Sequence, residues 1–76
     1  MRVCVVGGGK VGFYLSKTLM EHGHEPIMIE IDEHACARLA DNLDFPVVHG
    51  DGTLVEILEL AKIGNCQALI GVTGRD

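Results

Sequence analysis

The sequence predicts an α/β fold: a Rossmann-like, doubly wound parallel sheet, truncated after its fourth strand, with the order βαβαβαβ. Short apolar runs alternate with stretches of helical periodicity, and a glycine-rich turn follows the first run. Of the 76 residues, 47% are hydrophobic and only 4% aromatic, as in a parallel sheet of aliphatic residues covered by helices. We expect residues 1–76 to form a single, incomplete domain.

The first strand and helix surround the glycines. Residues 3–6 are continuously apolar and end at three glycines, which predicts a strand buried on both faces. Residues 10–22 are expected to be helical, with Gly23 as a left-handed stop. The apolar residues of this helix recur every four positions and are Val11, Leu15 and Leu19.

A second strand and helix follow. The apolar run at 26–31 predicts a strand that ends near Glu30, with proline tolerated at its first position. Asp32 can cap the next helix, Pro46 prevents its continuation, and Phe45 is expected to close the core beneath it. The expected apolar stripe of this helix consists of Ala35, Cys36, Leu39, Ala40 and Leu43.

Residues 47–49 predict a short third strand, and the turn Gly50-Asp51-Gly52 leads to a third helix. The run from Thr53 to Glu56 has the spacing of a capping box. The buried face of this helix is expected to be Leu54, Ile57, Leu58 and Ala61. Residues 68–73 predict a fourth strand beside the first, whose uncovered apolar edge indicates a partner or a fragment.

The turn after the first strand carries the GxGxxG pattern at Gly7, Gly9 and Gly12. Glycine at these positions permits a tight turn, close approach of a pyrophosphate, and close packing of helix on sheet. The amides of Gly9, Lys10 and Val11 are expected to meet a phosphate at the helix N-terminus, while Gly8 serves conformation and the Lys10 side chain is exposed. Glycines that merely form a tight turn are the alternative.

An acidic residue follows at the spacing expected for a ribose contact. Glu30 lies 18 residues after Gly12, and Asp32 is a rival on the same side of the strand that has a competing function as helix cap. We favour Glu30. A carboxylate here repels a 2′-phosphate and no arginine follows before Arg38, so NADP is disfavoured relative to NAD, ATP or ADP.

Two further segments are expected at the same edge of the sheet. Asp51 can reach an adenine amino group, although turn chemistry explains it equally well. Thr73 and Gly74 end the fourth strand beside the glycine loop and can line the far side of the pyrophosphate, with an exposed strand-end threonine as the alternative.

Other functions find little support. The net charge is −5 with scattered basic residues, which disfavours nucleic acid. The four histidines lack metal-site spacing and suit surface or turn positions, and the three cysteines are expected to be reduced and partly buried. Neither a signal peptide nor a membrane span is recognisable, so we expect a cytoplasmic protein. No catalytic set follows the fourth strand, which indicates binding without reaction.

Four ordered segments resemble the N-terminal domain of the Trk potassium-uptake and potassium-conductance-regulator family, the RCK or KTN domains. They are VVGGGKVG at 5–12, MIEID at 28–32, VVHGDGTLVEIL at 47–58 and ALIGVTGRD at 68–76. The resemblance places Gly7 to Val11, Glu30, Asp51, Thr73 and Gly74 on the family's nucleotide contacts. It implies NAD(H) or an adenine nucleotide as ligand.

The resemblance also implies a regulatory function. Such domains assemble as oligomers on a potassium channel or transporter at the inner face of the membrane, and ligand occupancy changes the conformation of that partner. The family's domains continue through two more strands and a dimerisation helix, which this sequence lacks. The alternatives are the cofactor-binding half of an NAD-dependent oxidoreductase and a minimal fold that binds nothing in particular.

Overall fold

The computed structural model describes residues 1–39, 41, 44–53 and 55–72, apart from the side chains of Val55 and Ile63. Its centre is a parallel sheet with the strand order β3-β2-β1-β4. The strands are β1 (Arg2–Val6), β2 (Glu25–Glu30), β3 (Val47–His49) and β4 (Ala68–Gly71). This confirms the predicted Rossmann-like fold, including the position of the fourth strand beside the first.

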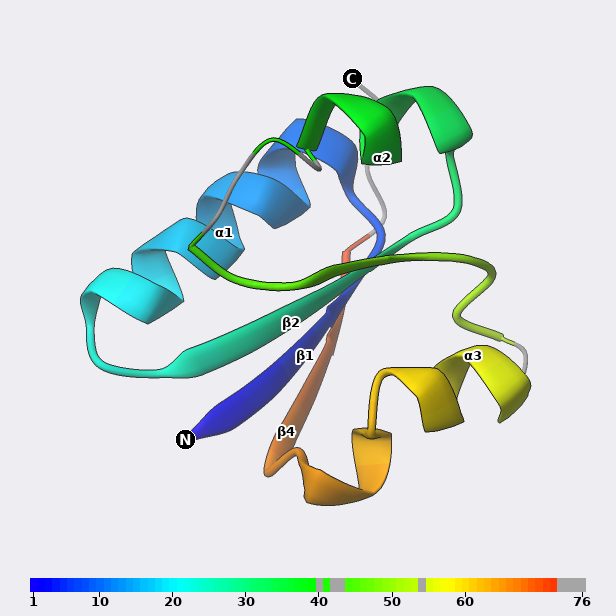
Figure 1. The fold of residues 1–76 in the computed structure, drawn as a ribbon. Coiled ribbons are helices and arrows are strands. Elements are labelled where there is room, and N and C mark those ends of the chain that lie inside the picture. Colours follow the sequence, from blue (N-terminus) through cyan, green and yellow to red (C-terminus); the bar gives the residue numbers. More distant parts are fainter. Residues whose placement is uncertain (40, 42–43, 54, 73–76) are drawn as a thin grey trace.

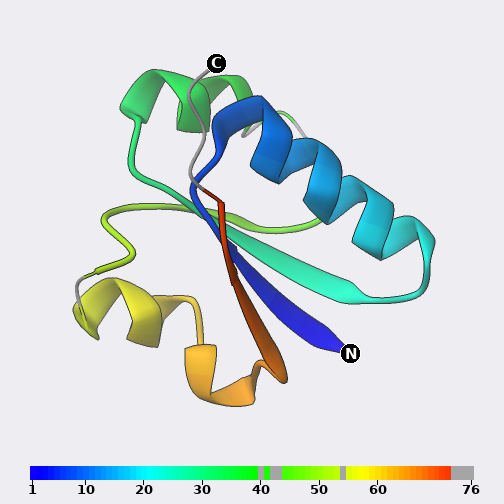
Figure 2. The same ribbon diagram turned by 180° about the vertical axis from the view of Figure 1, so that it is seen from behind.

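Helices lie on both faces of the sheet (Figures 1 and 2). On one face are α1 (Gly9–Glu21) and α2 (Glu33–Leu39), and on the other are α3 (Val55–Leu60) and a single 3-10 turn, η1 (Ile63–Asn65). The sequence did not predict η1. It follows Lys62, whose φ of 55° ends α3 and redirects the chain.

Strand β1 occupies the middle of the sheet and pairs in parallel with both β2 and β4. Val3, Cys4 and Val5 are only 2%, 0% and 0% exposed. Because helices cover both faces of this strand, side chains pointing either way must be apolar. The continuous apolar run in the sequence follows from that position.

Helix α1 approaches the sheet most closely through its small residues, not through the residues expected from periodicity. Gly12 and Ser16 are buried, and the Ser16 hydroxyl donates a hydrogen bond of 2.8 Å to the Gly12 carbonyl. The prediction that Val11 belongs to the buried face is wrong, because Val11 is 56% exposed. Close helix-to-sheet contact turns the glycine and serine inward and rotates Val11 outward, while Leu15 and Leu19 are half-buried.

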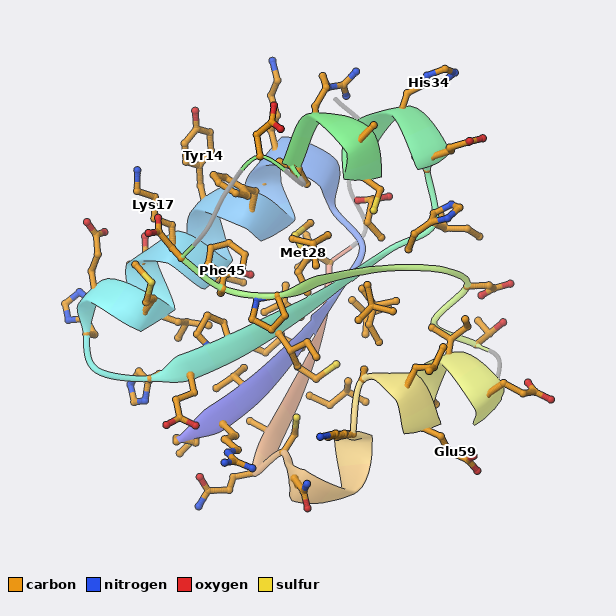
Figure 3. All side chains as sticks on the ribbon, in the orientation of Figure 1. Tyr14, Lys17, Met28, His34, Phe45 and Glu59 are labelled. Atoms are coloured by element: carbon orange, nitrogen blue, oxygen red, sulfur yellow. The ribbon has the colours of Figure 1, made fainter. Side chains whose placement is uncertain are left out.

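Aromatic and sulfur side chains fill the space between α1, α2 and the sheet. Figure 3 shows Met28 and Phe45 in this layer, whereas Tyr14 and Lys17 project outward from α1. The Phe45 ring lies 5.3 Å from that of Phe13, centroid to centroid, and Phe45 is 6% exposed. The expectation that Phe45 closes this core is confirmed.

The core on the α3 face is built around Cys4, Ile29 and Ala61. Ile57 and Leu58 of α3 pack against this cluster, as the sequence predicted, while the predicted positions Ala40, Leu43 and Leu54 lie outside the described residues. Burial, reinforced by the nearby Cys66 thiol, raises the pKa of Cys4 to about 11. All three cysteines are free and at least partly buried, as expected.

The outermost described strand on one side is β4. Its Leu69 is 58% exposed, and within the described part of the chain the strand pairs only with β1. The strand ends at Gly71, and Thr73, to which the prediction extended, lies outside the described residues. None of the described helices is long and apolar enough to cross a membrane.

Candidate functional site

The glycine loop joins β1 to α1 at the carboxyl edge of the sheet. Gly7, Gly8 and Gly9 all have left-handed backbone conformations, with φ of 78°, 91° and 49°. A Cβ at Gly12 would overlap the Gly7 carbonyl oxygen, so the first turn of α1 can lie against the loop only with glycine there. The predicted roles of Gly7 in the turn and of Gly12 in close packing agree with this geometry.

Two of the three amides expected to meet a phosphate already donate hydrogen bonds within the protein. The Gly9 amide donates to Oε1 of Glu30 at 3.0 Å. The Val11 amide donates to the Gly8 carbonyl at 2.9 Å, in the first turn of the helix. Lys10 is exposed on this turn, as expected. The N-terminus of α1 therefore meets a carboxylate from a different strand.

That carboxylate belongs to Glu30, the last residue of β2, which is only 4% exposed. Its second oxygen, Oε2, accepts a hydrogen bond of 3.0 Å from the Asp32 amide. Each carboxylate oxygen has two lone pairs, so each retains acceptor capacity. Glu30 thus links the glycine loop to the connection between β2 and α2.

Asp32, the rival acid, faces elsewhere. Its Oδ1 accepts hydrogen bonds from the amides of His34 at 2.8 Å and Ala35 at 3.1 Å, and its carbonyl accepts the Cys36 amide, so it is the N-cap of α2. The amides of Ala35 and then His34 lower the pKa of the Asp32 carboxyl. Because β2 ends at Glu30, strand alternation does not extend to Asp32, and the two acids are separated.

Asp51 forms a turn after β3. Its Oδ1 accepts hydrogen bonds from the hydroxyl of Thr53 at 2.7 Å and from the amide of Thr53 at 2.8 Å. These bonds, the hydroxyl's first, lower the pKa of the Asp51 carboxyl. The structure thus shows the turn chemistry that the sequence offered as one of two interpretations.

A cavity of about 180 Å³ opens beside the glycine loop, between the end of β1, the end of β2 and the Asp51 turn. Its lining residues are Val6, Gly7, Ile29, Ile31, Gly50, Asp51, Gly52 and Thr53. Ile31 is 62% exposed although it directly follows a buried strand. Sequence reasoning missed the apolar walls Val6, Ile29 and Ile31, although an isoleucine after a strand-end acid was the available signal.

The chain beyond β4 returns to the glycine loop. The Val72 amide donates to the Val6 carbonyl at 2.8 Å, and a Cβ at Gly8 would lie 2.5 Å from Cγ1 of Val72. Thr73 and Gly74, both predicted to lie at the site, are outside the described residues.

The positions of the four histidines are those of surface and turn residues. Three of them are exposed, and the fourth, His24, is half-buried in the turn before β2, which agrees with the predicted surface and turn positions. Figure 3 shows His34 projecting outward from α2. Within the ranges that the structure describes, no three His, Cys, Asp or Glu side chains gather as metal ligands would.

Comparison with known proteins identifies the family. Residues 3–76 match the TrkA-N domain family. The chain belongs to this family. The family that the sequence resemblance indicated is thereby confirmed.

Relatives of this TrkA-N domain include proteins named for potassium uptake. It is 41% identical over 76 residues to the Trk system potassium uptake protein TrkA homolog of Methanothermobacter thermautotrophicus, covering 100% of this chain and 35% of that protein. It is 30% identical to the homolog from Pyrococcus abyssi, covering 100% of this chain and 34% of that protein. It is 37% identical to TrkA of Halomonas elongata, covering 99% and 16%. The chain thus spans about a third or less of these relatives.

Proposed function

We propose that this TrkA-N domain binds an adenine nucleotide, with NAD(H) as the first candidate and ATP or ADP as alternatives, and that occupancy regulates a potassium transport system. The observation that carries the proposal is the position of Glu30. Its buried carboxylate contacts the N-terminus of α1 at the carboxyl edge of the sheet, and an apolar cavity opens on the other side of the same glycine loop, lined by Gly7. Nucleotides bind at this edge of doubly wound sheets.

The residues present suit the parts of such a ligand. The free lone pairs of Glu30 can accept the ribose hydroxyls, and the cavity between Ile29 and Ile31 offers apolar walls to a base. The loop from Gly7 to Val11, with Gly12 behind it, offers the positive end of a helix to the pyrophosphate. The second oxygen of Asp51 remains a candidate for the adenine amino group, and Thr73 and Gly74 for the far side of the pyrophosphate.

A 2′-phosphate is expected to bind poorly. It would bring a second anion against the Glu30 carboxylate, which two backbone amides hold in place at 3.0 Å each. Like charges at such short range repel strongly where water is partly excluded. We therefore expect NADPH to bind more weakly than NADH.

Titration calorimetry with NADH, NADPH, ATP and ADP tests the ligand. Glu30→Ala should weaken the preferred nucleotide by about tenfold or more, the order of one charge-assisted hydrogen bond. Glu33→Ala removes an exposed acid from the first turn of α2 and provides the matched control. The proposal fails if none of the four ligands binds more tightly than millimolar, or if Glu30→Ala leaves the affinity unchanged.

The link to potassium rests on the relatives, which are named Trk system potassium uptake proteins. We propose that the domain acts as an oligomer with a membrane subunit of a potassium channel or transporter, at its cytoplasmic side. Regulation requires the ligand to bind one conformational state better than another. Potassium uptake by cells carrying Glu30→Ala in the complete gene should no longer respond to the nucleotide; an unaltered response would contradict this function.

We further propose that the domain does not transform its ligand. The relatives are named for transport and not for a redox reaction. Incubation with NADH followed by chromatography should return the nucleotide unchanged. Conversion to NAD would instead support the cofactor-binding half of an oxidoreductase.

A further inference from the structure

We propose that Glu30 makes the glycine loop reject phosphates that lack a ribose. Its carboxylate already accepts the hydrogen bond of the Gly9 amide, which is a donor that a free phosphate would need. A nucleotide can engage the same carboxylate through its ribose hydroxyls, whereas inorganic phosphate or pyrophosphate would bring a second negative charge against it. This selectivity rests on the proposed nucleotide site and adds a criterion for what that site excludes.

The geometry of the α1 N-terminus supports this role. The N-cap residue is Gly8, which has no side chain to accept the first amides of the helix. Glu30 supplies the missing acceptor from the neighbouring strand, with Oε1 at 3.0 Å from the Gly9 nitrogen. The helix therefore already has an anion at its positive end.

Glu30 is also fixed in this position. It is 4% exposed, and its Oε2 is held by the Asp32 amide at 3.0 Å. Asp32 itself is anchored as the cap of α2. Rotation of the carboxylate into solvent to make room for a second anion is costly, because the partly buried hydrogen bonds from the amides of Gly9 and Asp32 would both be lost.

Charge makes the exclusion strong. At a partly buried surface, unit charges of like sign about 6 Å apart weaken binding by roughly tenfold to a hundredfold. The chain has a net charge of −5, and the cation on the first turn of α1, Lys10, is exposed. Free phosphate thus gains little elsewhere at this site to offset the repulsion.

A ribose changes this balance because its two hydroxyls are donors. Each can give a hydrogen bond to the carboxylate, which has lone pairs to spare beyond its two amide bonds. A nucleotide thereby offers attraction at Glu30 together with a phosphate for the helix. Pyrophosphate offers only the phosphate.

The two halves of the ligand, tested separately, should respond to Glu30→Gln in opposite directions. Affinity for pyrophosphate should rise by about tenfold or more, and affinity for adenosine should fall by about tenfold, equivalent to about 1.4 kcal/mol each. Glu33→Gln makes the same change of charge on an exposed residue at the same edge and should alter both affinities less than about twofold. Unchanged or weaker pyrophosphate binding by Glu30→Gln overturns the proposal.

A measurement on the unaltered protein covers the case in which Glu30→Gln does not fold. In amide NMR spectra, adenosine should shift the Gly9 resonance, because the ribose competes for the carboxylate that this amide contacts. Pyrophosphate at millimolar concentration should leave it in place, and a comparable shift would overturn the exclusion. If pyrophosphate is excluded but neither adenosine nor NADH binds, the nucleotide function fails while the exclusion stands.

Discussion

The two ends of the parallel sheet hold acidic side chains in different ways. At the carboxyl edge, Glu30, Asp32 and Asp51 all accept backbone amides. At the amino edge, Glu25 pairs with the guanidinium of Arg2 at 2.9 Å, and these side chains are 70% and 56% exposed. One edge fixes its carboxylates with the main chain, and the other leaves its acid in a solvated ion pair.

The difference follows from the topology. All four strands run the same way, so α1, α2 and the turn before α3 begin at the carboxyl edge and present there N–H groups that have no acceptor within their own helix. An apolar hollow of about 260 Å³ between Pro26, Pro46 and Cys66 lies at the amino edge, and it is more spacious than the one of about 180 Å³ beside the glycine loop. Cavity size therefore does not single out the carboxyl edge; what distinguishes that edge is the hydrogen bonding of its carboxylates by backbone amides.

The largest effect is expected at Gly12, where the carboxyl edge is most tightly packed. Gly12→Ala would force a Cβ into the Gly7 carbonyl oxygen and should destabilise the domain by about 3 kcal/mol or more. Urea denaturation followed by circular dichroism measures this. Gly64→Ala is the control, since a Cβ there meets nothing within 4 Å. Equal effects at both positions would show that the loop does not require close approach.

Removing one acid from each edge should destabilise the protein by different amounts. Glu30→Ala leaves the amides of Gly9 and Asp32 without acceptors and should cost about 2–3 kcal/mol of unfolding free energy. Glu25→Ala breaks an exposed ion pair and should cost less than about 1 kcal/mol. If urea denaturation shows similar losses of unfolding free energy for both variants, the carboxylate bound by backbone amides contributes no more than the one in the exposed ion pair.

A smaller, opposite effect is expected where α3 ends, near the amino edge. Lys62 is the one non-glycine residue with positive φ in the described part of the chain, at 55°. Lys62→Gly should stabilise the protein by about 0.5–1 kcal/mol, because glycine adopts this conformation without a Cβ clash. The melting temperature should rise for Lys62→Gly and not for Lys62→Ala; a rise for both would mean that backbone strain is not the cause.

The smallest effect concerns acid pH. Hydrogen bonds lower the pKa of Asp32 and of Asp51 below that of an unfolded aspartate, about 3.9. For Asp32 they come from the amides of Ala35 and His34, and for Asp51 from the hydroxyl and then the amide of Thr53. Their contribution to stability is therefore present above that value and is lost as pH falls through the lowered pKa. Asp32→Asn keeps a capping side chain that cannot titrate, so stability should fall less steeply below pH 4. Asp41→Asn, at an exposed position, provides the control. If the stability of both variants falls equally steeply below pH 4, the Asp32 carboxyl does not contribute to the loss of stability in acid.

Most elements of the fold could be predicted because their patterns are local. The apolar run of β1 and the Asp51 turn lie where the sequence indicated. Strand β2 begins one residue earlier than predicted, so that Pro26 is its second residue and not its first. The side of α1 that faces the sheet was misjudged, since hydrophobic periodicity favoured Val11 while close packing required Gly12 and Ser16. The spacing of apolar residues does not predict a contact that is made by small residues such as glycine and serine.

The sequence by itself determined the strand and helix order, the position of the glycine loop and the presence of an acid at the end of β2. These follow from hydrophobic periodicity and from glycine's freedom at positive φ, which are properties of neighbouring residues. Only the tertiary structure decided that Glu30 contacts the loop while Asp32 caps α2. That choice depends on where β2 ends and on donors 21 and 2 residues away from Glu30, which only folding brings together around one carboxylate.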